Sequence, residues 1–447
     1  YPRIGCLRVL SSTRLINDTS KCILAMIINK LRKLLEYLLV FCIIIEFYTP
    51  YLVFPPIKQA ILISPCLILL CLITISNYSL SRRVNLFILI YLIGALIPMI
   101  LTGIDNYPTY IIRFIILLPA MWIYLYLRKG IGYKEYLSLF FKFSNTVTSI
   151  AVISLIMWFL CSILQILPAT ALIPFEWSPK TFFIPTYLGI YFETQTVTLF
   201  GTNIWRNSGI FNEGPMFNMV LCIAFSIEYF MNPQRSKIKL LILTVTIIST
   251  FTTTGQFFLI GIMGLLLYTR FIKKYKFFII IMTPIIIFFS YLLAEEIIDN
   301  KRETSGEISV VSRTEDIQNC IEVGVNHPIF GIGITSGFWH GQEIGFSNSL
   351  FSLFARGGLY TLALYLGTLI VIPFLYSIKY KNYSWLLAML SFFVVFTITS
   401  SILKYLTFLF IAWGLSNIDL KKKCSYKREQ LKRISILQIE INETKNQ

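Results

Sequence analysis

Both histidines of this chain lie in one polar stretch, residues 295–347, between two long apolar segments. An imidazole can take up or release a proton near neutral pH, so this stretch is a natural place to look for acid–base chemistry. His327 directly precedes Pro328, which is more typical of a turn residue with a satisfied ring than of a catalyst. For His340, which follows Trp339 in a polar setting, a catalytic and a structural role are equally consistent with the sequence.

Arginines form the second group of residues with suitable chemistry. Arg206 and Glu213 are seven positions apart in a polar segment and would share one face if that segment were helical. Arg313 lies in the same stretch as the histidines. Arg113 and Arg356 lie within apolar segments, where an unpaired charge costs at least ~2.5 kcal/mol. A guanidinium stays charged and donates two parallel hydrogen bonds, which suits a phosphate ligand.

The composition places these residues in an integral membrane protein. Of the 447 residues, 56% are hydrophobic and 14% charged, and the mean hydropathy of +0.72 is far too high for a soluble domain of this size. Backbone polar groups in a bilayer must be paired internally, so we expect an all-α polytopic membrane protein. Apolar runs long enough to cross a bilayer predict about twelve transmembrane helices. The predicted spans are 35–54, 57–76, 85–102, 109–127, 145–167, 215–231, 238–252, 256–270, 277–294, 349–376, 384–402 and 404–418.

Two pairs of these spans are short, and each pair could instead be a hairpin that enters the membrane and returns. One pair flanks Thr253 and the other flanks Lys404.

Lysine and arginine determine the predicted orientation, because short cytoplasmic loops retain these residues. Most of the 39 basic residues fall on one side if both termini are cytoplasmic. The predicted parts are then a cytoplasmic N-terminal segment 1–34, a transmembrane domain 35–420 and a basic cytoplasmic tail 421–447. The net charge of +17 therefore reports topology and contact with anionic membrane lipids, and nucleic acid is not an expected partner.

Two large loops, 168–205 and 295–347, face outward in this topology. The first is rich in aromatic and β-branched residues and could include a short hairpin or an interfacial segment. The four arginines lie on or near this side, where a lipid-linked diphosphate would place its head group. Alternatively, the arginines pair with carboxylates such as Glu46, Asp105 or Glu213 and only hold helices together. For one arginine the two interpretations are balanced, whereas four on one side favour the phosphate ligand.

No resident metal or other cofactor is expected. Cys320 is the single cysteine among nine that is predicted on the exported side, so a disulfide framework is not expected. The cysteines and histidines also lack zinc-ligand spacing. Gly331 and Gly333 resemble a fragment of a dinucleotide-binding loop, but a third glycine and a preceding strand are missing.

At the positions discussed above, the chain resembles the bacterial O-antigen polymerase and ligase superfamily, whose members process undecaprenyl-diphosphate-linked glycans. The resemblance covers the topology of the whole chain and, by motif, about residues 206–370. The positions that carry it are Arg206, Gly209, Phe211, Glu213, Pro215, Ser312, Arg313, the run His327-Pro328-Ile329-Phe330-Gly331-Ile332-Gly333, and Asn348.

The resemblance implies inverting, metal-independent glycosyl transfer on the outer face of the bacterial inner membrane, in a GT-C-like helical fold. We therefore predict a polymerase of undecaprenyl-diphosphate-linked oligosaccharide repeat units, serving O-antigen lipopolysaccharide, capsule or exopolysaccharide. Its partners would be the lipid-linked oligosaccharide, the membrane lipids and a chain-length regulator protein.

The resemblance also implies roles for the arginines. Arg206 and Arg313 are expected to bind the donor diphosphate and help it leave, while Arg113 and Arg356 support it from within the membrane. The other residues expected at the substrate-binding site are His327, Gly331, Gly333 and Asn348.

The chain departs from the family pattern at one position. Many members have a His-Asn pair where this chain has Ser347-Asn348, and that histidine is a candidate in ligases for assisting the acceptor hydroxyl. Its absence argues against a ligase and leaves the base unassigned. Glu213 and His340 are the outward groups that could accept the proton.

Two other functions remain open at this stage. A ligase would transfer finished glycan to a lipid or protein acceptor. A transporter would use the intramembrane arginines to line a path for an anionic solute. Against transport, the polar groups of the spans lie mainly at their outer ends, whereas transporters concentrate them at the midplane.

Overall fold

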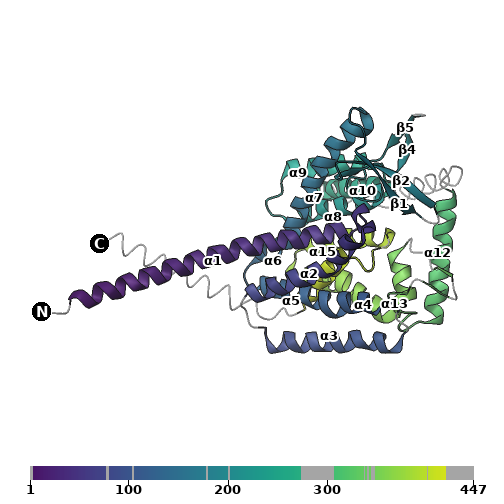
Figure 1. Ribbon diagram of the computed structural model, residues 1–447. Helices are drawn as coiled ribbons and strands as arrows, with labels where there is room; N and C mark the ends of the chain where they lie inside the picture. The colour runs from purple at the N-terminus through teal and green to yellow at the C-terminus, as the bar shows by residue number, and fades with distance from the viewer. Residues whose placement is uncertain are drawn as a thin grey trace.

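The computed structural model describes most of the chain, and the described part is mostly helical (Figure 1). The predicted span 277–294, His340, Ser347 and the tail 421–447 lie outside the described residues. The described residues are 4–76, 80–102, 105–177, 180–199, 202–272, 307–336, 338–339, 342–343, 348–399 and 401–418.

Helices alternate with short connections along the first half of the chain. A long helix, α1, projects from the helical body at its N-terminal end (Figure 1). The elements are α1 (Ile4–Glu46), η1 (Pro50–Val53), α2 (Pro55–Ile75), α3 (Arg82–Leu101), α4 (Tyr107–Tyr110), η2 (Ile111–Leu117), α5 (Leu118–Lys129), α6 (Tyr133–Tyr136), α7 (Ser138–Met157), η3 (Trp158–Ile163), α8 (Gly214–Ser226), η4 (Ile227–Met231), α9 (Lys237–Ser249) and α10 (Thr253–Ile272).

The second half is also helical where it is described. Its elements are α12 (Glu307–Asn326), α13 (Ser349–Leu366), η5 (Gly367–Val371), α14 (Ile372–Tyr380), α15 (Ser384–Ile398) and α16 (Tyr405–Leu415). Each predicted span that lies within the described residues overlaps one of the helices. Within the described residues, six helical segments are long and apolar enough to cross a membrane, which makes the chain a multi-pass membrane protein. They are Pro55–Ile75, Arg82–Leu101, Tyr107–Lys129, Ser138–Ile163, Gly214–Met231 and Ser349–Tyr380. The count of twelve, the orientation and the GT-C-like fold remain predictions.

Helix α16 forms the centre of the body. All of its residues, from Tyr405 to Leu415, are buried, and Phe410 stacks on Phe392 of α15 with ring centroids 4.0 Å apart. At 1.5 Å per residue, its 11 residues extend only ~16 Å, about half of a bilayer's hydrocarbon core. This helix is therefore a buried core helix, and with α15 it forms a pair that turns back near Lys404.

The first outward loop forms β-structure, so the prediction of an all-α chain is wrong there, while the predicted hairpin is confirmed. Strands β1 (Ala171–Trp177), β2 (Lys180–Tyr187) and β3 (Tyr191–Phe192) form an antiparallel sheet. Strands β4 (Thr196–Leu199) and β5 (Thr202–Trp205) form a separate hairpin. Exposed sheet edges are stable where water can satisfy them, which agrees with the predicted position of this loop outside the hydrocarbon core.

The second outward loop contains the helix α12, which the sequence analysis did not predict, and the two-residue strands β6 (Phe338–Trp339) and β7 (Gln342–Glu343). Helix α12 packs along α13 at the edge of the body (Figure 1). Cys320 and Val323 of α12 are buried against Ala355 of α13.

The segment after α12 is inserted into the hydrogen-bond ladder of α13. Helix α13 is broken at Gly358, whose φ of 60° and ψ of −170° are not helical. The carbonyls of Ala355 and Arg356 accept from the backbone N–H groups of Ile332 (3.1 Å) and Gly333 (2.9 Å).

On the other side of the break, the N–H groups of Leu359 and Tyr360 donate to the carbonyls of Pro328 (2.8 Å) and Ile329 (3.0 Å). In a continuous helix these four backbone groups would bond to each other as i→i+4 pairs. The run from Pro328 to Gly333 replaces those bonds and ties the end of α12 to the middle of α13.

We predict that Gly331→Ala destabilises this junction, whereas Gly367→Ala does not. Gly331 has a φ of +66°, and a Cβ there would lie 2.6 Å from the carbonyl oxygen of Ala355. The left-handed conformation alone costs an L-residue ~1–2 kcal/mol, and the close contact adds to that cost. A Cβ on the helical Gly367 would meet nothing within 4 Å. Thermal melting of the purified variants in detergent should show a lower midpoint only for Gly331→Ala; equal midpoints would contradict the proposed junction.

Candidate active site

The segment that precedes α8 is a non-helical loop anchored to several elements. The backbone N–H of Asn207 donates to the carbonyl of Ser249 at 3.1 Å, and that of Asn212 donates to the carbonyl of Tyr48 at 2.9 Å. The Asn207 side chain is fully buried and donates to the Ser249 hydroxyl at 3.0 Å. These bonds fix the loop against the end of α9 and the chain that follows α1.

Arg206 and Glu213 are brought together by this loop and not by two turns of helix. Glu213 has extended backbone angles and precedes the first residue of α8, Gly214. A Cβ on Gly214 would lie 3.6 Å from Cδ and 3.7 Å from Cβ of Arg206. The arginine side chain therefore lies against the start of α8, beside Glu213.

Glu213 is the group in this loop best suited to proton transfer. Burial raises its pKa to about 7, while the positive charges of Arg313 and Arg206 act in the opposite direction. Arg313 comes from α12, so the two outward loops contribute charges to one site. A carboxyl with a pKa near 7 is well matched to general-base work at neutral pH.

Arg206 retains hydrogen-bonding capacity for a ligand. It is half-buried, and burial lowers the pKa of its guanidinium while the charge of Glu213 raises it. Its Nε atom is buried and has no hydrogen-bond partner among the described residues. Arg313, in contrast, is exposed. A buried donor without a partner is costly, and an anionic ligand would satisfy it.

Arg113 is placed in an ion-pair cluster beside the same loop. Its guanidinium lies 3.1 Å from the carboxylate of Glu46, which also has Lys404 at 3.8 Å. The guanidinium also lies over the ring of Tyr405, 5.6 Å from its centroid. The structure therefore shows the pairing with Glu46 that the sequence allowed as an alternative, and a contact with diphosphate remains a prediction.

For two of the remaining predicted site residues, His327 and Arg356, the structure gives backbone hydrogen bonds. The backbone carbonyl of His327 accepts from the N–H of Gly331 at 3.0 Å in the turn after α12, as expected for a turn residue. The backbone carbonyl of Arg356 accepts from the N–H of Gly333. Its guanidinium charge opposes the rise in pKa that burial causes at the thiol of Cys320 in α12. A role of these residues in substrate binding remains untested.

Asn348 caps the N-terminus of α13. Its side-chain oxygen accepts from the backbone N–H groups of Leu350 (2.9 Å) and Phe351 (3.3 Å). Its use in substrate binding would have to compete with these bonds.

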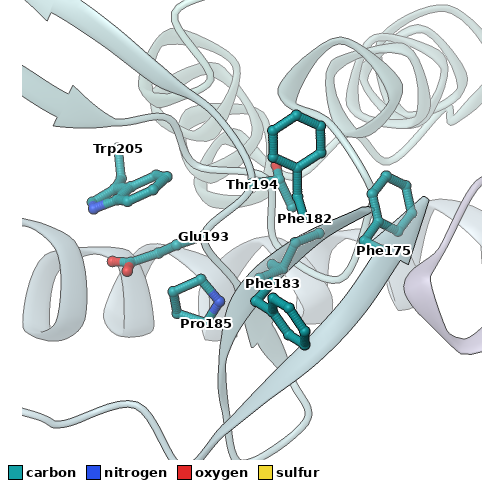
Figure 2. A pocket seen from close by; sticks show the side chains of 8 residues that line it. Phe175, Phe182, Phe183, Pro185, Glu193, Thr194 and Trp205 are labelled. Carbon is teal, nitrogen blue, oxygen red and sulfur yellow. The ribbon is translucent and has the colours of Figure 1, made fainter. Parts of the chain in front are cut away.

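A pocket beside Arg206 was missed by the sequence analysis. It has a volume of about 410 Å³ and is formed by the strands of the first outward loop (Figure 2). Its lining residues are Phe175, Phe182, Phe183, Ile184, Pro185, Glu193, Thr194 and Trp205. The aromatic richness of this loop indicated strands, but which rings converge depends on the register of the sheet.

A comparison with known protein families finds a match for part of the chain. Residues 238–366 match the family model described as O-antigen ligase. The resemblance to the O-antigen polymerase and ligase superfamily is thereby confirmed. The matched region runs from α9 to the end of α13 and includes Arg313, Arg356 and the junction around Gly331, whereas Arg206 and Glu213 precede it. The chain has no match among curated proteins or solved structures.

A double substitution should separate the structural and ligand-binding roles of Arg113. Arg113→Met leaves Glu46 with less compensation, and breaking a buried ion pair typically costs ~3–5 kcal/mol. If the arginine serves only this pair, Arg113→Met combined with Glu46→Gln, which keeps an acceptor for Lys404 and for the N–H of Tyr405, should recover both the melting midpoint and activity. If the arginine also binds phosphate, stability should recover while activity stays low. Melting in detergent and glycan chain length in cells measure the two effects.

Proposed function

We propose that the protein polymerises undecaprenyl-diphosphate-linked oligosaccharide repeat units on the outer face of the bacterial inner membrane. The observation that best supports this proposal is the position of Glu213 under the influence of Arg206 and Arg313, which come from two separate outward loops. A carboxylate whose charge interacts with the charges of two guanidinium groups combines a proton acceptor with sites for a diphosphate. The lipid-linked oligosaccharide, the membrane lipids and a chain-length regulator are its proposed partners.

In the proposed reaction, Glu213 accepts the proton of the acceptor hydroxyl as its oxygen attacks the anomeric carbon of the donor sugar. The bond between that carbon and the diphosphate oxygen breaks, and the electron pair leaves with the undecaprenyl diphosphate. Attack opposite to the leaving group inverts the anomeric configuration. Arg206 and Arg313 stabilise the negative charge that grows on the leaving diphosphate, so no metal is required.

In this proposal, the ion-pair cluster of Glu46, Arg113 and Lys404 supports the site. Glu46 and Arg113 lie next to the loop that carries Glu213, because Asn212 of that loop bonds to the backbone of Tyr48. Glu46 compensates part of the positive charge of Arg113 and Lys404, and the proposal assigns the leaving diphosphate to Arg206 and Arg313. Arg356, on α13, would support the diphosphate from the side of α12.

Substitution of the two arginines tests the assignment. We expect Arg206→Ala and Arg313→Ala each to lower the rate of polymerisation by about 10²–10³-fold, the loss typical of one electrostatic contact to a developing charge. Arg206→Lys should fall between wild type and alanine, because it keeps the charge and loses the bidentate geometry. Purified protein with its own lipid-linked repeat unit should produce a ladder of products. Normal ladders from both alanine variants, at wild-type protein levels, would refute the proposal.

The pH dependence of the rate tests Glu213 as the base. Because a base must be deprotonated, kcat/KM should rise with pH and level off above about 7, where Glu213 has lost its proton. In Arg313→Gln, a charge that lowers the pKa of Glu213 is removed, so the rise should move to higher pH. In Arg83→Gln, an exposed residue at the other end of the body, the profile should stay in place. An unshifted profile in Arg313→Gln would exclude Glu213 as the titrating base.

Ligation is the second candidate, and the description of the matched family model favours it. A ligase would use the same donor site but transfer a finished glycan to a different acceptor. Deletion of the gene distinguishes the two functions. Loss of a polymerase leaves single repeat units, whereas loss of a ligase leaves long lipid-linked polymer that is not attached to its acceptor. We expect single units, because Ser347 stands where many members have the histidine associated with the ligase acceptor.

A further inference from the structure

The pocket in the first outward loop has the composition of a carbohydrate-binding site. Phe175, Phe182, Phe183 and Trp205 line it together with the single carboxylate of Glu193. In Figure 2, Trp205 and Glu193 are on one side, Phe175 on the other, and Phe182 and Phe183 between them. Its volume of about 410 Å³ lies within the range of ~300–1,000 Å³ typical of small-molecule sites, which combine aromatic walls with few polar groups.

Glu193 is held in one orientation and still has capacity for a ligand. Its side chain is buried, one carboxylate oxygen accepts from the Ser162 hydroxyl at 2.7 Å, and the other accepts from the Tyr187 hydroxyl at 2.9 Å. A carboxylate has about four acceptor positions, so these bonds leave roughly half of them for ligand hydroxyl groups. The oriented carboxylate is a polar anchor in an otherwise apolar pocket.

The pocket is directly connected to the loop that carries the proposed donor site. Trp205 precedes Arg206 in the chain, and the N–H of Arg206 donates to the carbonyl of Gln195 at 2.9 Å. The hydroxyls of Thr194 and Ser208 are hydrogen-bonded at 2.9 Å. A sugar attached to a phosphate at Arg206 would therefore have the pocket next to it.

We propose that this pocket binds sugar residues of the lipid-linked repeat unit. The apolar faces of pyranose rings would pack on Trp205 and Phe182, and sugar hydroxyls would donate to Glu193. The pocket is then a determinant of which glycan is accepted, separate from the arginines that bind the diphosphate. This inference rests on the proposed function, because it takes the glycan of the same substrate as the ligand.

A lipid acyl chain is the main competing occupant, because Phe182 and Phe183 are about half or more exposed. Two observations favour the glycan. An acyl chain offers no hydrogen-bond donor to the buried carboxylate of Glu193, whereas sugar hydroxyls do. The hydroxyl of Thr194 also belongs to the lining of the pocket, whereas a lipid site would be lined by apolar groups.

Binding of the free oligosaccharide tests the proposal without requiring catalysis. The probe is the repeat-unit oligosaccharide released from its lipid diphosphate, added to the full chain in nanodiscs and observed by saturation-transfer NMR. We expect Trp205→Ala to weaken binding by about 3- to 10-fold through lost stacking. Glu193→Gln should weaken it by about 10-fold or more through lost charge-assisted hydrogen bonds.

Two controls make the test specific. Trp205→Phe keeps an aromatic ring and should retain most of the binding, which separates a stacking role from a requirement for folding. Leu172→Ala changes an exposed residue of β1, in the same sheet but outside the pocket lining, and should bind like wild type. Binding that is equal in wild type, Trp205→Ala and Glu193→Gln would overturn the proposal.

Brominated lipids test the competing occupant. If the nanodisc lipids enter the pocket, bromine on their acyl chains should quench Trp205, which is seen as a difference between wild type and Trp205→Phe. Such quenching, unaffected by the oligosaccharide, would overturn the proposal. Absence of this quenching, together with binding that depends on Glu193, would support it.

Failure of this inference can be distinguished from failure of the proposed function. Arg206→Gln should abolish product ladders but leave binding of the free oligosaccharide, which lacks the diphosphate. If product ladders depend on Arg206 but Trp205→Ala and Glu193→Gln bind the oligosaccharide like wild type, only the inference about the pocket is wrong. If binding depends on the pocket while Arg206→Gln still makes normal ladders, the proposed function is wrong and the sugar site remains.

Discussion

The candidate site depends on a backbone exchange between the segment from Pro328 to Gly333 and the broken helix α13. Two hydrogen bonds that a continuous helix would make internally are replaced by four bonds between the two segments. Because buried backbone groups without partners are costly in an apolar environment, the break at Gly358 and the inserted segment require each other. This exchange fixes the end of α12 and, through that helix, the position from which Arg313 acts on Glu213. The motif that carries the family resemblance is thus a structural junction as well as a sequence signature.

Buried charges at both ends of the helical body are compensated by specific partners. At the predicted cytoplasmic end, the buried carboxylate of Glu36 pairs with Lys142 and accepts from the hydroxyl of Tyr124. At the other end, Glu46 pairs with Arg113 and Lys404. Isolated charges at these depths would be expensive, and paired charges can fix how neighbouring helices meet. Arg206 is half-buried beside Glu213, and its buried Nε has no hydrogen-bond partner among the described residues, a feature that it shares with Arg113.

The outward loops divide the proposed chemistry between two kinds of surface. Glu213 and the arginines offer charge and a proton acceptor, which suit a diphosphate leaving group and an attacking hydroxyl. The strands offer aromatic rings and one oriented carboxylate, Glu193, which suit the neutral sugars. Because Trp205 and Arg206 are adjacent, the two surfaces meet at one peptide bond. A substrate that is charged at one end and neutral along the rest of its length fits this arrangement.

Composition and periodicity were sufficient to predict a multi-pass helical membrane protein, because the energetic cost of burying an unpaired backbone leaves few alternatives in a bilayer. The motif from His327 to Gly333 was sufficient for the superfamily, and the polar segment from Arg206 to Pro215 was correctly singled out. The sequence offered Glu46 among several possible partners for the arginines, but it could not select Glu46 for Arg113, since the two are 67 positions apart. Sequence patterns also could not reveal the helix α12, whose mixed polar face has no strong apolar periodicity, or the break at Gly358.

What only the tertiary structure decided is which of these residues share one environment. Arg206 and Glu213 meet through a loop and not through a helix, because Asn207 and Asn212 are bonded to distant elements. Glu193 and Trp205 line one pocket because strand pairing brings separate parts of a loop together. The sequence by itself determined that the chain folds in a membrane and which kinds of side chain are available at its predicted outer face. Long-range backbone hydrogen bonds and burial determined their proximity and the pKa of Glu213, and neither is encoded in local spacing.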